Sequence, residues 1–178
     1  MRSAAQIKAA VAANMKFAFE EIKTAFSKKT GYDVVAVYGS SGRLVSQIKN
    51  GAPFDLFISA DTGFADNICA SGLNAGKSKI YAFGKLVLWT VKPCDLSRGV
   101  SLLADSAIRT VALGDMKLTV YGPAARDYLI RVHLWDCVKN KAVYGSSIAH
   151  AAQYIVNGSA DIGFCAKSIV LSKEMNGR

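Results

Sequence analysis

The stretch that decides the fold is Tyr38–Asp61, with the sequence YGSSGRLVSQIKNGAPFDLFISAD. It begins at the end of a β-branched run, 33–38, which predicts a strand. A short helix is expected from about Gly42 to Asn50, because Gly51 is a typical residue to end it. The apolar run Asp55–Ser59 then predicts a second strand. Strand, helix and strand in this order are typical of an α/β fold with parallel strands.

The same alternation extends to both sides of this stretch. On its amino side, a short apolar run is bounded by Asn14, and the helical periodicity that starts at Met15 ends at Gly31. On its carboxyl side, the pattern predicts helices at 62–70, 102–108, 123–132 and 148–156, and strands at 86–91, 110–113, 141–144 and 161–165. A polar, glycine-bearing segment, 76–84, is the best candidate for a boundary within the chain.

The composition limits the classes of protein to which the chain can belong. Of its 178 residues, 51% are apolar and 20% are charged, which predicts a compact globular protein. The formal net charge is +9, but the basic residues are scattered, so we expect no nucleic-acid partner and a field that attracts small anions. No apolar run reaches the roughly eighteen residues that a membrane span needs. The first residues are too short for a signal peptide, and they suggest either a vector-derived start before a mature sequence or a cytosolic start.

Motifs of catalysis and metal binding are incomplete in this sequence. The segment Gly72–Ser78 resembles a P-loop, but it is one residue short between its glycines and leads into a strand region. The segment Gly39–Gly42 lacks the further glycine of a nucleophile elbow, because Arg43 stands there. The cysteines lack the spacing of zinc ligands, and we interpret them as buried thiols, although an oxidising compartment would allow a disulfide. We therefore expect no enzyme.

Four expected junctions between a strand and the following helix carry a small polar or hydrogen-bonding residue. They are Asn14, Ser40-Ser41, Tyr121-Gly122 and Ser146-Ser147. Each helix start presents backbone N–H groups and the positive end of the helix dipole. In an open α/β sheet these starts lie beyond the carboxyl ends of the strands, where ligands bind. Several of them in one crevice would bind an anion without a charged side chain, while ordinary helix capping would explain any one alone.

Similarity to a known family extends over most of the chain from Ile7 onward. The most specific stretch is Gly51–Asp61, and the others are 12–14, 29–35, 38–44 and 47–48, with looser ones at 86–89, 112–115 and 160–164. In these stretches the chain resembles the periplasmic molybdate-binding proteins of ABC transporters. The resemblance implies the type II periplasmic-binding-protein fold. That fold is an α/β architecture of two lobes, here residues 1–83 and 84–178, each a mainly parallel sheet flanked by helices.

The resemblance also implies which residues bind the oxyanion in an interlobe cleft. They are Asn14, with Ala13 beside it, and Ser41 in the first lobe, and Tyr121 and the backbone N–H of Ile148 in the second. Some family members carry a tyrosine where Ala166 stands, so Tyr121 is expected to supply the phenol. Since the protein would contact the oxygens of molybdate, we expect no direct metal-ligand side chain and no cofactor. Tungstate, which is nearly the same size, should compete.

The function that the resemblance implies is capture of molybdate in the periplasm and delivery to the ABC permease of the inner membrane, without catalysis. The alternatives are a receptor for another tetrahedral oxyanion, such as sulfate, and a cytosolic ligand-sensing domain. Family chains continue beyond the position of Arg178 with a strand that returns to the first lobe and a terminal helix. A monomer is expected, but an exposed strand edge without that segment would favour dimerisation or domain exchange.

Overall fold

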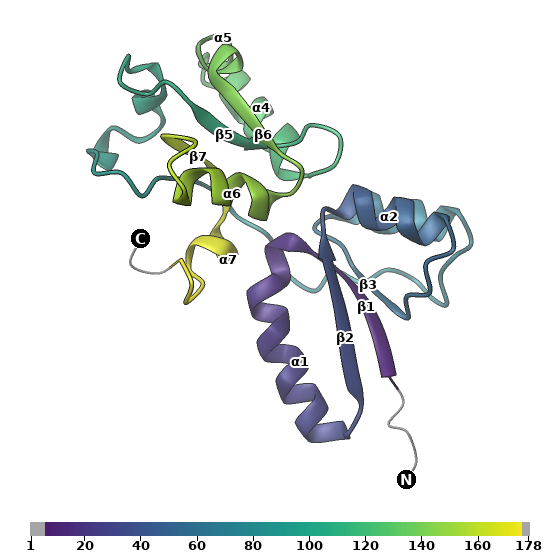
Figure 1. Cartoon of the computed structure of the whole chain (residues 1–178). Helices are drawn as coiled ribbons and strands as arrows, with labels where there is room; N and C mark the ends of the chain where they lie inside the picture. The colour runs from purple at the N-terminus through teal and green to yellow at the C-terminus, as the bar shows by residue number, and fades with distance from the viewer. Residues whose placement is uncertain (1–5, 176–178) are drawn as a thin grey trace. The chain divides into compact units, whose positions relative to one another are not determined.

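The computed structural model describes residues 6–175 and divides the chain into two compact units, Met1–Phe83 and Gly84–Arg178 (Figure 1). We call them unit 1 and unit 2. Both are built from a sheet flanked by helices, which confirms the predicted α/β class. In the described part of the chain, no helix is both long and apolar enough to cross a membrane.

Unit 1 is built on a three-stranded parallel sheet with the order β2-β1-β3. Its elements are β1 (Gln6–Ala12), the 3-10 turn η1 (Ala13–Met15), α1 (Lys16–Thr30), β2 (Asp33–Gly39), α2 (Ser41–Lys49), β3 (Leu56–Ile58) and α3 (Thr62–Ala70). As predicted, Gly31 terminates α1: it directly follows Thr30, and its φ of 75° lies in the left-handed region that glycine adopts readily.

The central strand β1 is buried, and the predicted binding residues of unit 1 lie at the edge of the sheet where this strand ends. Its residues Ala9–Ala12 are at most 1% exposed, and Phe19 of α1 packs on one face with Ala9 and Val34. The register pairs Ala12 with Gly39 of β2 and places the end of β3 beside β1. All three strands therefore end at one edge of the sheet, which is where α/β proteins bind ligands.

Unit 2 contains a four-stranded sheet with the order β4-β7-β5-β6, in which β5, β6 and β7 are parallel and β4 is antiparallel to β7. Its elements are β4 (Leu86–Trp89), the 3-10 helix η2 (Leu96–Ala104), β5 (Val111–Gly114), α4 (Tyr121–Arg131), α5 (Trp135–Val138), the 3-10 turn η3 (Lys139–Lys141), β6 (Ala142–Gly145), α6 (Ile148–Val156), β7 (Ile162–Ala166) and α7 (Lys167–Val170). Val111 and Leu113 of β5 and Leu129 of α4 are fully buried in its core.

The structure corrects the predicted secondary structure in unit 2. The helix expected over 102–108 is wrong, because η2 ends at Ala104 and the carboxylate of Asp105 then accepts a hydrogen bond from the N–H of Ala107. The helix α4 begins at Tyr121, before the predicted start at Pro123. The helices α5 and α7 were not predicted, since four residues each are too few to show a helical period.

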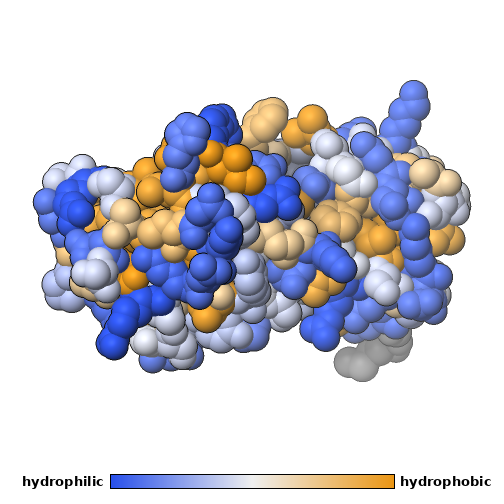
Figure 2. Space-filling model, turned by 90° about the horizontal axis from the view of Figure 1, so that it is seen from above, coloured by the Kyte–Doolittle hydropathy of each residue, from blue (hydrophilic) through white to orange (hydrophobic). Residues whose placement is uncertain are grey.

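The exposure of the cysteines also differs in part from the prediction. Of the four thiols, only that of Cys165 is buried, and burial raises its pKa to about 12. Cys94 and Cys137 are exposed and Cys69 is half-buried, so the interpretation as buried thiols is wrong for these three. Figure 2 shows that apolar residues lie in separate patches among hydrophilic ones on the face in view.

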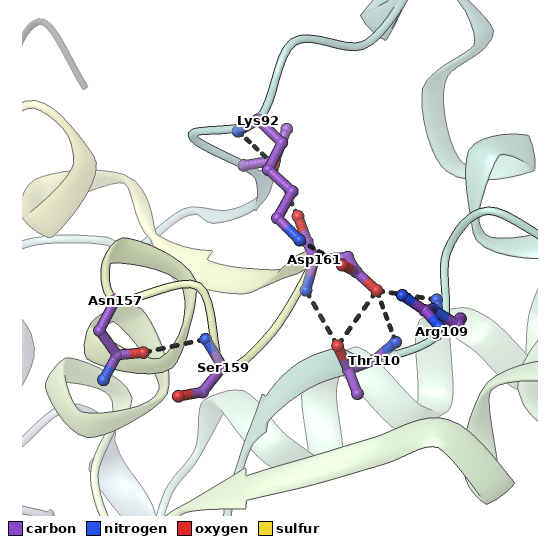
Figure 3. Close-up of polar contacts among 7 residues, drawn as sticks. Lys92, Arg109, Thr110, Asn157, Ser159 and Asp161 are labelled. Carbon is purple, nitrogen blue, oxygen red and sulfur yellow. Dashed lines mark hydrogen bonds and ion pairs between the residues drawn. The ribbon is translucent and has the colours of Figure 1, made fainter.

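The carboxylate of Asp161 ties together the amino ends of β5 and β7 (Figure 3). Its Oδ2 accepts hydrogen bonds from the N–H groups of Arg109 and Thr110, at 2.8 and 2.9 Å, and from the Thr110 hydroxyl at 3.1 Å. Its Oδ1 accepts a hydrogen bond from the ammonium group of Lys92. Lys92 first, and then these donors, hold the pKa of the carboxyl well below its usual range. Asp161 is therefore an ionised anchor at this edge of the sheet.

Candidate functional site

The start of α2 in unit 1 carries a hydroxyl that does not cap the helix. Ser40 occupies the N-cap position, but its side chain makes no capping hydrogen bond. Its Oγ is buried and has no hydrogen-bond partner among the described residues. Such a group is uncommon in native proteins and often indicates a bound water or ion. The positive end of this nine-residue helix lies at the same place and favours an anion.

Ser41, the first residue of α2, is held by the segment that follows β3. Its Oγ accepts a 3.0 Å hydrogen bond from the N–H of Ala60. A hydroxyl has one proton to donate and two lone pairs, so this bond uses a lone pair and leaves the proton for another acceptor. Ser41 is 2% exposed, which means that its side chain is fixed by the fold itself. It can act as a donor to a ligand oxygen.

Asn14 lies at the same edge of the sheet. It belongs to η1, directly after β1, and is 7% exposed. Because the ends of β1 and β2 are paired, Ala13 and Asn14 follow one strand where Ser41 follows its neighbour. The structure thus brings the predicted residues of unit 1 to one edge of one sheet.

The start of α4 in unit 2 offers few backbone donors. Oγ1 of Thr119 accepts a 3.0 Å hydrogen bond from the N–H of Gly122, and Pro123 has no N–H. Tyr121, the first residue of α4, adds a phenol hydroxyl to the polar groups at this position. Tyr121 is 6% exposed, and a Cβ placed on Gly84 would lie 2.7 Å from its hydroxyl oxygen. The backbone of Gly84 therefore lies directly against the phenol.

The helix α6 begins with an ordinary serine cap. The hydroxyl of Ser147 accepts a 3.1 Å hydrogen bond from the N–H of His150, as the capping interpretation predicts. The N–H groups of Ile148 and Ala149 belong to the same first turn, where a helix provides no backbone acceptor. Ile148 is 3% exposed, so only its backbone, and not its side chain, suits a polar ligand.

The segments that lead to Tyr121 and Ile148 leave the sheet of unit 2 at the same edge. Gly114 ends β5, Gly145 ends β6, and the two glycines are paired in the parallel register. A Cβ on Gly145 would overlap the backbone nitrogen of Ala151, so α6 packs directly on the end of its own strand. The predicted residues of unit 2 therefore share an edge, as those of unit 1 do.

The carboxylates of Asp61 and Asp115, which follow β3 and β5, accept hydrogen bonds from backbone donors. Oδ1 of Asp61 accepts a 3.0 Å hydrogen bond from the N–H of Phe64 and caps α3. Oδ1 of Asp115 accepts hydrogen bonds from the N–H groups of Lys117 and Leu118, both at 2.8 Å. Asp61 thus caps a helix, whereas Asp115 binds the backbone of the turn that follows β5. The candidate groups that face a ligand are therefore hydroxyls, an amide and backbone N–H groups.

Sequence reasoning missed several groups that shape these helix starts. The hydrogen bond from Gly122 to Thr119 had a signal in the sequence, because a threonine three residues before Gly122 has the spacing of a capping side chain. The hydrogen bond from Ala60 to Ser41 had no signal in the sequence, since it joins residues far apart along the chain. Ala166, at the position where some family members carry a tyrosine, is fully buried at the end of β7.

Comparisons with known proteins agree with this architecture. The chain matches the model of the bacterial extracellular solute-binding protein family over residues 7–178. The molybdate-binding protein ModA of Azotobacter vinelandii is 38% identical over 94% of this chain and 67% of its own length. That of Rhodobacter capsulatus is 37% identical over 97% of this chain and 68% of its own length.

The fold is similar to that of the periplasmic molybdate-binding protein of Azotobacter vinelandii, with a TM-score of 0.85 and 34% identity. That match covers 90% of this chain and 71% of the solved one. The chain spans about two thirds of the length of the curated relatives that it matches. From the family match and these identities, the chain belongs to the bacterial extracellular solute-binding protein family and is a homologue of its molybdate-binding members.

Proposed function

We propose that the chain binds molybdate in the periplasm and delivers it to the permease of an ABC importer, without catalysing a reaction. The observation that carries the proposal is the start of α2, where the buried hydroxyls of Ser40 and Ser41 accompany the positive end of a helix. The relatives named as molybdate-binding proteins support the choice of ion.

Several fixed donors are needed because a dianion loses strong hydration when it enters a protein. In unit 1 we assign this role to Asn14 and Ser41, with Ala13 beside them. In unit 2 we assign it to the phenol of Tyr121 and the backbone N–H of Ile148. These groups bind oxygen atoms, so molybdenum needs no side-chain ligand and the protein needs no cofactor.

A site of donors prefers an oxyanion that carries no proton. Hydrogen phosphate would bring a proton that needs an acceptor, and the groups that we assign to the ion are all donors. We therefore expect discrimination against phosphate. Tungstate has the charge and nearly the size of molybdate, so it should bind at the same site and compete.

Titration calorimetry with molybdate, tungstate, sulfate and phosphate tests this proposal. We expect heat and saturation with the first two ions, displacement of one by the other, and no saturable heat with phosphate. Binding of sulfate alone would replace the proposal by a receptor for another oxyanion, and absence of heat with all four ions would refute it. Light scattering on the same samples should give the mass of a monomer, with and without molybdate.

A further inference from the structure

One peptide unit of unit 1 is hydrogen bonded at both of its polar atoms. Its carbonyl oxygen, from Ser59, accepts a 2.7 Å hydrogen bond from the hydroxyl of Tyr81. Its N–H, from Ala60, donates the 3.0 Å hydrogen bond to Oγ of Ser41. Because the peptide unit is planar and conjugated, its two ends cannot reorient independently. Tyr81 is therefore connected to Ser41 through a single rigid amide.

The hydrogen bonds of this connection all point in one direction. Tyr81 donates to the carbonyl, the amide donates to Ser41, and the Ser41 hydroxyl keeps its own proton to donate. Hydrogen bonds in such a chain polarise one another, so each bond strengthens the next donor. Burial raises the pKa of the Tyr81 phenol, which therefore keeps its proton and remains a donor. A negatively charged oxygen suits the last position of the chain.

We propose that Tyr81 is a positioning residue for oxyanion binding, which fixes the Ser41 hydroxyl and strengthens it as a donor through the Ser59–Ala60 peptide. This inference rests on the proposed function, in which Ser41 donates to the ion. The hydroxyl proton of Tyr81 is donated to the carbonyl of Ser59, so it is not available to the ion. Tyr81 as a whole residue is 52% exposed and lies in the irregular segment before β4, while its hydroxyl bond is partly buried.

If the hydrogen bond of Tyr81 only stabilised the fold, its loss would have a different effect. The bond would hold the segment of Tyr81 against the end of β3, and its loss would lower stability whether or not Ser41 has a hydroxyl. A positioning residue acts on affinity only through the group that it positions. The two roles therefore separate in a double-mutant cycle between Tyr81 and Ser41.

The experiment compares Tyr81→Phe with Tyr32→Phe, which removes the hydroxyl of an exposed tyrosine of the same unit. Calorimetry should show that Tyr81→Phe weakens molybdate binding by about threefold to tenfold, the usual effect of losing one hydrogen bond. Tyr32→Phe should stay within about twofold of the wild type. In a Ser41→Ala background, Tyr81→Phe should add less than about twofold. Wild-type affinity in Tyr81→Phe, or a full additional loss in that background, would overturn the proposal.

A second measurement needs no ligand. The amide proton resonance of Ala60 in the NMR spectrum should move upfield in Tyr81→Phe, because its bond to Ser41 weakens, and stay in place in Tyr32→Phe. An unmoved resonance in Tyr81→Phe contradicts the inference. Failure of the wild type to bind any oxyanion counts against the proposed function instead, while the Ala60 resonance still reports whether Tyr81 acts on the Ser41 bond.

Discussion

Thr110 donates two hydrogen bonds to one carboxylate oxygen of Asp161, from its N–H at 2.9 Å and from its hydroxyl at 3.1 Å. Asp161 in return donates its own N–H to the Thr110 hydroxyl oxygen at 3.1 Å. This reciprocal set joins the segments that enter β5 and β7. With Lys92, it lowers the pKa of the carboxyl, so the folded state favours the ionised form.

Asp161→Asn is therefore expected to lower the free energy of unfolding by about 1–3 kcal/mol at neutral pH, because hydrogen bonds to a charged group are lost. The contribution of the ionised carboxylate is present above the unfolded-state pKa of about 4 and is lost as the pH falls through the lower folded-state pKa. Urea denaturation from neutral pH down to about pH 3 should show a smaller acid-dependent loss in the variant than in the wild type.

The control for this prediction is Asp136→Asn. Asp136 pairs with Lys139 within one turn, but its side chain is 88% exposed. Exposed pairs contribute little, so stability should hardly change. Identical pH profiles for the wild type and Asp161→Asn would contradict the role assigned to the Asp161 carboxylate.

Ser41→Ala should weaken molybdate binding by about 1–3 kcal/mol, because one oxygen of the ion loses its donor. Ser46→Ala, on an exposed part of α2, is the matched control and should bind as the wild type does. Calorimetry under identical conditions compares the three proteins. An unchanged affinity in Ser41→Ala would remove this residue from the site.

The neighbouring serine should respond differently in the absence of ligand. Since Oγ of Ser40 is buried without a described partner, Ser40→Ala should leave the free energy of unfolding unchanged or raise it by up to about 1 kcal/mol. Ser41→Ala should lower it, because the N–H of Ala60 loses its acceptor. Thermal denaturation of both variants without ligand measures the difference. A clear loss of stability in Ser40→Ala would mean that its hydroxyl is satisfied in solution.

Gly84→Ala should displace the Tyr121 phenol, because the new methyl group would lie 2.7 Å from the hydroxyl oxygen. We expect molybdate affinity to fall by about 1 kcal/mol, as in Tyr121→Phe. Stability should change little, since the displaced atom is the end of a side chain. Gly76→Ala is the control, because a Cβ there meets nothing within 4 Å. If Gly84→Ala binds normally and Tyr121→Phe does not, the contact between them has no effect on binding.

The bounds of a helix were predicted best where a capping side chain directly precedes the helix. The observed bounds of α3 and α6 equal the predicted ones, and their N-caps, Asp61 and Ser147, both bind a backbone N–H of the first turn. The predicted start of α4 is wrong because its N-cap residue is Val120, which offers no capping side chain, while Oγ1 of Thr119 accepts the N–H of Gly122. The predicted helix over 102–108 is wrong because the carboxylate of Asp105 binds the backbone N–H of Ala107 and so favours a turn over a helix.

The candidate site was predictable to a smaller extent. Asn14, Ser41, Tyr121 and Ile148 were assigned from a family resemblance, and their roles in binding stay predictions. The bonds that orient Ser41 join segments distant in sequence, as does the contact of Gly84 with the Tyr121 phenol. No local periodicity or capping pattern indicates such contacts, because tertiary packing alone creates them.

The anchor of Asp161 lies at the amino ends of β5 and β7, whereas Gly114 and Gly145, at the carboxyl ends of β5 and β6, lead toward the proposed donors. The hydrogen bonds of Asp161 and the donors that we propose for the ion thus lie at opposite edges of one sheet. In an oxyanion sensor engineered from this protein, substitutions around Asp161 should therefore change the stability of unit 2 without changing the specificity of the proposed donors.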